Sequence, residues 1–80
     1  MMVASQIRAA RALLRWSAHK LAAESGVSWT TIQRMEAGDG VPSATARNID
    51  KIQKALEAAG VIFIDEDDEG PGVRLRKQQD

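Results

Sequence analysis

The sequence contains no cysteine, and its only aromatic residues are two tryptophans and one phenylalanine among 80 residues. Without cysteine there is no disulfide framework, no thiolate metal site and no thiol nucleophile. No apolar run approaches the roughly 20 residues that cross a membrane, and the start lacks the uncharged apolar run of a signal peptide. We therefore expect a cytoplasmic protein with no membrane partner.

Residues that carry catalytic or metal-binding chemistry are also scarce. The single histidine, His19, has no carboxylate at triad or ligand spacing, and we expect it to be solvated or to contact a phosphate. The acidic residues 65–69 lack the alternating ligand spacing of a calcium loop and are interpreted as a solvated hairpin loop. The sequence therefore predicts no enzyme activity, no metal site and no cofactor.

Charge is unevenly distributed along a chain that is neutral as a whole. Residues 1–54 hold eight basic and four acidic residues, a net charge of +4, whereas residues 55–80 hold three basic and seven acidic residues, a net charge of −4. A basic body with an acidic end is compatible with phosphate binding by the body. It is equally compatible with an ordinary charged surface, so charge alone does not identify the partner.

Apolar residues at helical spacing predict a first helix over residues 5–15 and a fourth helix that ends at Gly60. The cap of the fourth helix is left open between Ser43 and Thr45. The residues expected to face the core from these two helices are Ile7, Ala10, Leu14, Ile49, Ile52 and Leu56.

Two short helices are predicted between the long ones. Ser17 is positioned to cap the first of them, and Ser28 the second, which ends at residues 37–38. Gly26 lies between them and is expected to have a positive φ. Two short helices joined by a tight glycine turn form a helix-turn-helix arrangement, which presents its second helix to the DNA major groove.

After residue 60 the apolar pattern changes from helical to extended. Residues 61–64 are β-branched or aromatic and 73–76 alternate apolar and basic, so they predict two strands of a hairpin joined by a loop over 65–72. Val73 and Leu75 are expected to face the helices.

The uninterrupted apolar run of the first strand predicts cover on both of its faces, and the helices of one chain can cover only one. We therefore expect a second subunit on the hairpin, with Ile62 and Ile64 at a dimer interface. A chain this short also buries only about 60% of its unfolded surface, which favours self-association. The predicted organisation is one domain, with helices in 1–60, a hairpin in 61–76 and a disordered tail in 77–80.

A family resemblance lies in residues 21–38, whose sequence is LAAESGVSWTTIQRMEAG, and in the following Pro42 and Ser43. This segment resembles the phage-repressor-like helix-turn-helix family, the Cro-type or XRE-type regulators. The resemblance covers about residues 4–60, and the hairpin is similar to an extension of some small bacterial members. It implies a mainly α, compact four-helix domain that binds double-stranded DNA.

The resemblance also implies that the helix over 28–37 enters the major groove. Glutamine suits adenine, arginine suits guanine, and threonine can bond an acceptor or pack on a thymine methyl. Trp29 either packs on thymine methyls or the sugar–phosphate wall, or else makes an unrelated contact or fills the core. The residues expected to contact bases are Trp29, Thr30, Gln33 and Arg34.

Further residues are implied to hold the DNA backbone at helix N-termini. Two departures from the family pattern weaken this anchoring: Ala18 stands where relatives usually have glutamine, and Asp39 stands in a loop where basic residues are common. We therefore expect modest affinity from one subunit, which again favours a dimer. The residues expected to contact phosphates are Ser17, Ser28, Thr31, Ser43 and Arg47.

Arg11 and Glu36 stand at positions that form a partly buried salt bridge in this family. Their implied role is structural, and a surface ion pair of little energetic weight is the alternative.

The first hypothesis is a homodimeric, sequence-specific transcription regulator that binds an inverted repeat through the helix over 28–37. The second is an antitoxin that binds a partner toxin and its own operator. A third is an interaction module that binds no nucleic acid.

Overall fold

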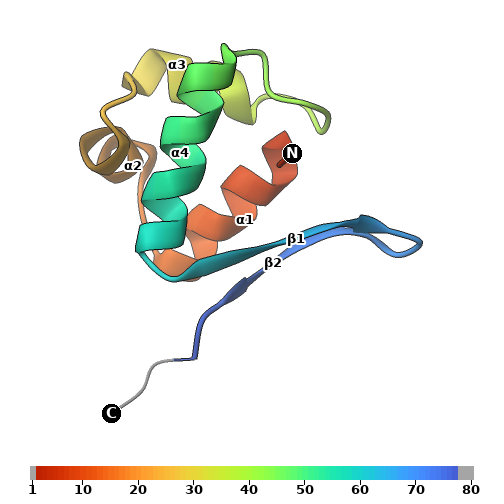
Figure 1. The fold of residues 1–80 in the computed structure, drawn as a ribbon. Coiled ribbons are helices and arrows are strands. Elements are labelled where there is room, and N and C mark those ends of the chain that lie inside the picture. The colour runs from red at the N-terminus through yellow and green to blue at the C-terminus, as the bar shows by residue number, and fades with distance from the viewer. Residues whose placement is uncertain (1, 78–80) are drawn as a thin grey trace.

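The computed structural model describes residues 2–77 and confirms a mainly α chain that ends in a β-hairpin. The four helices form one body, and the hairpin extends from it as an arm (Figure 1). None of the helices described in residues 2–77 has the length and hydropathy that a membrane span requires. Of the predicted tail, Lys77 is exposed and 78–80 lie outside the described residues. The elements are α1 (Ala4–Leu14), α2 (Ala18–Ser25), α3 (Trp29–Glu36), α4 (Ala46–Ala58), β1 (Val61–Asp67) and β2 (Gly70–Leu75).

Hydroxyl side chains start three of the four helices. Ser17 accepts a hydrogen bond from the amide of Lys20 at the start of α2, at 3.0 Å. Thr45 accepts one from the amide of Asn48 at the start of α4, at 3.2 Å. Thr45 is thus the cap of α4, and Ser43 lies in the loop before it. These caps occupy backbone donors that would otherwise have no partner in the first turn of each helix.

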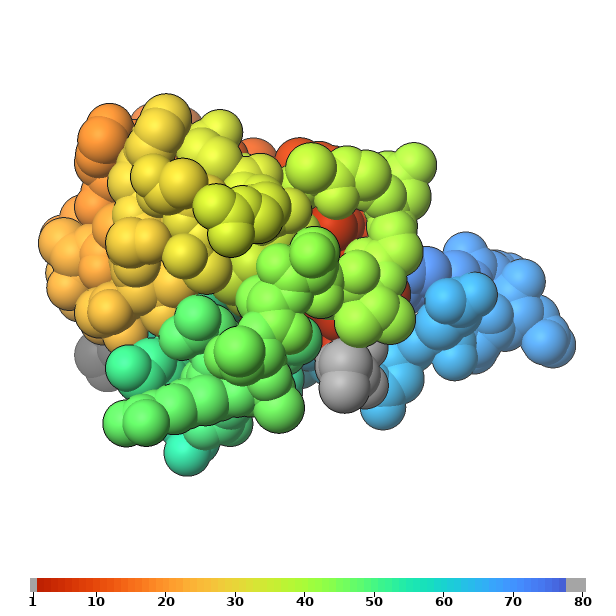
Figure 2. Space-filling model, turned by 90° about the horizontal axis from the view of Figure 1, so that it is seen from above, coloured from red at the N-terminus to blue at the C-terminus, as the bar shows by residue number. Residues whose placement is uncertain are grey.

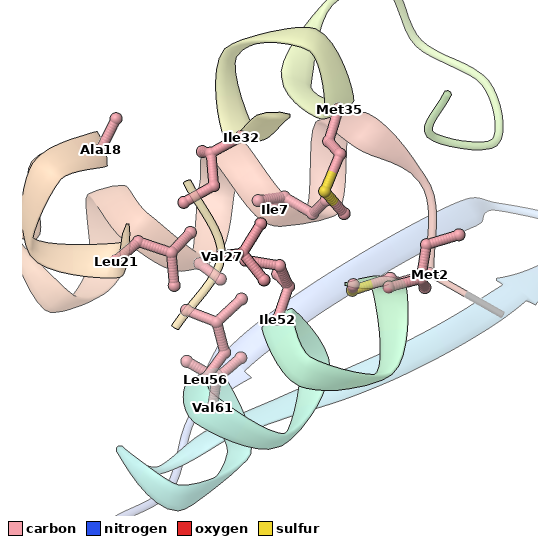
Figure 3. Packing of buried hydrophobic residues seen from close by; sticks show 12 residues of the cluster. Met2, Ile7, Ala18, Leu21, Val27, Ile32, Met35, Ile52, Leu56 and Val61 are labelled. Carbon is pink, nitrogen blue, oxygen red and sulfur yellow. The ribbon is translucent and has the colours of Figure 1, made fainter. Parts of the chain in front are cut away.

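The core forms where all four helices meet the first residue of the hairpin. Ile7, Leu21, Ile52 and Leu56 point toward one another from α1, α2 and α4, and Val61 closes the cluster from β1 (Figure 3). The predicted apolar faces of the first and fourth helices are therefore core-facing. Because the first residue of β1 belongs to this core, the hairpin starts in contact with the helical body.

The acidic segment is partly strand rather than loop, which corrects the sequence prediction. β1 continues to Asp67, and β2 begins at Gly70, so only Asp68 and Glu69 connect the strands. The register pairs Ile64 with Gly72 and then shifts, so that Asp67 pairs with Gly70. Cross-strand hydrogen bonding therefore extends the hairpin through residues whose own preferences favour a loop.

One side chain of α1 fastens the hairpin to the body. Gln6 is only 4% exposed, and its amide nitrogen donates to the carbonyl oxygens of Ile64 and Gly72, both at 2.9 Å. Its amide oxygen accepts from the backbone amide of Val3 at 2.8 Å. Gln6 thus joins α1 to both strands at the point where their register shifts.

The two faces of the hairpin have different surroundings. Phe63 and Val73 are cross-strand partners and pack against the core. Leu75 pairs with Val61 and shares the face of Val73, as the alternation predicts, and it is 41% exposed. It lies against Gly60, which has no side chain to cover it. Ile62 and Ile64 alternate to the opposite face of β1 and are partly buried.

Candidate nucleic-acid interface

The helix expected to read DNA has one buried and one exposed face. Ile32 and Met35 are fully buried in the core. On the opposite side of α3, residues four positions apart lie next to each other, so Trp29 lies beside Gln33 and Thr30 lies beside Arg34. All four predicted base-contacting residues are exposed: Trp29, Thr30, Gln33 and Arg34. Trp29 is 44% exposed, which excludes its interpretation as a core residue.

The turn between α2 and α3 sets the angle at which α3 is presented. Gly26 has a φ of 75°, as expected for the left-handed end of a short helix. Val27 follows it and is buried, and its amide donates to the hydroxyl of Ser25 at 3.2 Å. The turn is therefore held by a backbone conformation, a buried side chain and a hydrogen bond.

The last turn of α3 is fastened to α1 by a salt bridge. Arg11 Nε lies 2.6 Å from Glu36 Oε2, and Arg11 Nη2 lies 2.8 Å from Glu36 Oε1. The Glu36 side chain is 8% exposed and that of Arg11 is 22% exposed, so the pair is partly buried. The hydrogen bonds to Glu36 raise the pKa of the Arg11 guanidinium above its ordinary value, with burial acting in the opposite direction. This ion pair holds the end of α3 against the body.

A second arginine of α1 binds the segment that follows α3. Arg8 donates to the carbonyl oxygens of Glu36 and Gly38 and lies 3.0 Å from the carboxylate of Asp39. The Asp39 charge, which stands where basic residues are common in the family, is therefore paired with a cation of the same chain. Sequence reasoning missed Arg8, whose role arises only when α1 and the end of α3 meet.

The predicted phosphate contacts lie at helix starts. The Ser28 hydroxyl accepts from the amide of Thr31 at 3.2 Å and donates to its hydroxyl at 2.9 Å, so both side chains form the cap of α3. Arg47 is exposed in the first turn of α4. Ser43 is exposed in the preceding loop, and Ser17 caps α2.

Seen from above, α3 lies between α2 and the first turns of α4, and the hairpin projects beyond the opposite edge from α2 (Figure 2). The exposed face of α3 and the start of α4 thus share one side of the molecule. Across residues 2–77, no carboxylate lies within ion-pair distance of Arg34 or Arg47.

His19 takes a position that sequence reasoning did not find. Its imidazole stacks on the indole of Trp29, with 5.3 Å between ring centroids and 9° between ring planes. The two residues are ten positions apart and on different helices, so no helical spacing relates them. Only the angle of the turn between α2 and α3 brings them together.

Comparison with known proteins agrees with this geometry. The profile of the helix-turn-helix family matches residues 7–60, which include all four helices except the first three residues of α1. Among curated proteins, no sequence matches the chain. Since the family match covers more than half of the chain, the protein belongs to the Cro-type (XRE) helix-turn-helix family of DNA-binding transcription regulators.

Proposed function

We propose that the protein is a sequence-specific regulator that reads the major groove with α3 as a homodimer on an inverted repeat. The observation that carries the proposal is the division of α3 into a buried face, with Ile32 and Met35, and an exposed face whose four side chains suit base edges. The buried face fixes the helix, and the exposed face is free for a duplex.

The base contacts follow from the chemistry of each side chain. Arg34 suits the paired acceptors of guanine, and Gln33 suits the donor and acceptor of adenine. Thr30 offers a hydroxyl and a methyl group, and Trp29 offers an apolar ring with one N–H donor. These four residues carry the sequence preference.

The DNA backbone is held by groups that flank α3. The starts of α2, α3 and α4 direct backbone N–H groups outward, and a helix N-terminus favours a phosphate. Ser17, Ser28, Thr31 and Ser43 lie at or near these starts, and Arg47 adds a positive charge at the start of α4. These contacts set affinity and orientation rather than sequence preference.

In the proposed dimer, the second subunit packs on the face of the hairpin that carries Ile62 and Ile64. Ile62 and Ile64 lie on the face of β1 opposite to Val61 and Phe63, which belong to the core or pack against it. An apolar strand face next to a small core is a suitable surface for a second copy of the chain. Two copies related by a two-fold axis would present two α3 helices to half-sites about 34 Å apart.

Selection of bound duplexes from random DNA tests this function directly. We expect an inverted repeat to be enriched, and we expect Arg34→Ala and Thr30→Ala to weaken binding to that repeat and alter its base preference. Glu57→Gln, in the last turn of α4 and therefore at the other end of that helix from Arg47, is the control. Unchanged affinity and preference in both α3 variants would show that α3 is not the reading helix.

The oligomeric state is tested separately by light scattering. We expect the wild type to have the mass of two chains and Ile62→Asp and Ile64→Asp to have the mass of one. A wild-type mass of one chain would remove the homodimer and favour the second candidate, in which the hairpin binds a partner protein such as a toxin.

A further inference from the structure

The stacked pair of His19 and Trp29 lies at the edge of the proposed reading surface. His19 is the second residue of α2, and Trp29 is the first residue of α3. Both side chains are exposed, and their rings are almost parallel, at 9°. The centroid separation of 5.3 Å falls within the range that is typical of offset aromatic stacking.

The stack contributes little to the core, because neither ring is buried in it. The angle between α2 and α3 is set beneath them by buried residues, Leu21, Val27 and Ile32. An exposed indole with no neighbour would sample several side-chain rotamers. The imidazole covers one face of the indole and so selects one orientation of it.

We propose that His19 is a positioning residue for sequence recognition, and that it holds Trp29 so that only the uncovered face and edge of the indole meet the DNA. This inference rests on the proposed function. A ring held in one orientation loses less conformational freedom on binding, and it discriminates better because it cannot turn to contact a different base feature. The base feature that suits the free indole face is the methyl group of thymine, the apolar group that the major groove presents.

The role of His19 differs from that of the neighbouring Lys20. The Lys20 ammonium lies 5.7 Å from the centroid of the other tryptophan ring, Trp16, and 2.8 Å from Glu24. Lys20 therefore has no part in the stack. Its replacement changes charge near the same surface without altering Trp29, which makes Lys20→Ala a matched control.

The first measurement needs no DNA. In a Trp16→Phe background, Trp29 is the only tryptophan, and time-resolved fluorescence anisotropy reports its local motion. We expect His19→Ala to increase the fast component of depolarisation, and we expect His19→Phe, which restores a flat ring, to reverse the increase. An unchanged fast component in His19→Ala would overturn the inference.

The second measurement uses the selected duplex and versions with one thymine per half-site replaced by uracil, which lacks the methyl group. We expect the ratio of the affinities for the thymine and uracil duplexes to fall about three- to ten-fold in His19→Ala and to recover in His19→Phe. Lys20→Ala should weaken binding to all duplexes alike. Failure of His19→Phe to restore discrimination would show that His19 does not act through its flat ring and would overturn the positioning role.

Trp29→Ala separates this inference from the function on which it rests. If Trp29→Ala lowers discrimination and His19→Ala does not, the base contact stands and the positioning role of His19 is wrong. If Trp29→Ala retains full discrimination, the proposed base contact of Trp29 is wrong, and the inference falls with it. If no duplex is selected at all, the proposed function itself fails, whatever the anisotropy shows.

Discussion

The guanidinium of Arg11 forms two hydrogen bonds with the carboxylate of Glu36, at 2.6 and 2.8 Å, and thereby ties α1 to the last turn of α3. A third hydrogen bond joins Arg11 to the carbonyl oxygen of Trp16 at 3.0 Å. Helix α3 is thus held at its start by the turn after α2 and at its end by this ion pair.

We expect Arg11→Ala to lower the free energy of unfolding by about 3 to 5 kcal/mol, because it leaves the carboxylate of Glu36 buried without a partner. Thermal or urea unfolding followed by circular dichroism measures the loss. Lys54→Ala, which removes an exposed ion pair with Asp50, is the control and should cost about 1 kcal/mol or less. Similar losses of unfolding free energy in both variants would show that the Arg11–Glu36 pair stabilises the protein no more than an exposed ion pair does.

The raised pKa of Arg11 predicts how the stabilisation by the Arg11–Glu36 pair changes with pH. Because the folded pKa of Arg11 is raised, its contribution is fully present below the ordinary arginine pKa and is lost only as pH rises above it. The difference in unfolding free energy between wild type and Arg11→Ala should therefore stay constant between about pH 7 and pH 10. A decrease over that interval would contradict the assignment.

Gln6→Ala should release the hairpin from the helices. It removes two donors from the carbonyl oxygens of Ile64 and Gly72 and should cost about 1 to 3 kcal/mol. Hydrogen exchange should speed up in the hairpin more than in the helices. Gln53→Ala is the control, because the Gln53 side chain donates to the exposed side chain of Glu57, at 3.3 Å, and not to the hairpin. Equal exchange rates in the two variants would show that Gln6 does not fasten the hairpin.

Arg15→Gly should stabilise the protein. Arg15 ends α1 with a φ of 57° and is the one non-glycine residue with positive φ among residues 2–77. Glycine adopts this conformation without the steric cost, which stabilises the folded state. The greater conformational freedom of glycine in the unfolded chain offsets part of this stabilisation. We expect a net gain of about 0.5 to 1 kcal/mol in chemical unfolding. Arg15→Gln removes the charge but keeps the steric cost, so it should show no such gain.

Arg47→Ala tests the backbone contacts of the proposed complex. Since a phosphate contact carries no sequence information, affinity should fall by a similar factor for the selected and scrambled duplexes. The slope of log affinity against log salt should become shallower by about one. Lys54→Ala, seven residues further along α4, should leave the slope unchanged. A loss confined to the selected duplex would assign Arg47 to base reading instead.

The elements that depend on local patterns could be predicted from the sequence. Ser17 and Ser28 begin helices because a hydroxyl accepts from a first-turn amide, and Gly26 ends one because glycine tolerates positive φ. The division of α3 into a core face and an exposed face follows from its 3.6-residue period. The limits of the hairpin were less well predicted, because cross-strand pairing extends β1 to Asp67 through acidic residues.

Local patterns in the sequence predicted which segments are helical, the caps of α2 and α3, the apolar faces of the helices and the family that the chain resembles, since each of these depends on neighbours along the chain. The caps of α1 and α4 were not settled in this way. The stacking of His19 on Trp29, the pairing of Arg8 with Asp39 and the hydrogen bonds of Gln6 to both strands arise only when the elements pack together. Such contacts join residues from 10 to 66 positions apart. Their geometry depends on the angles at which packed elements meet, and no local pattern encodes those angles.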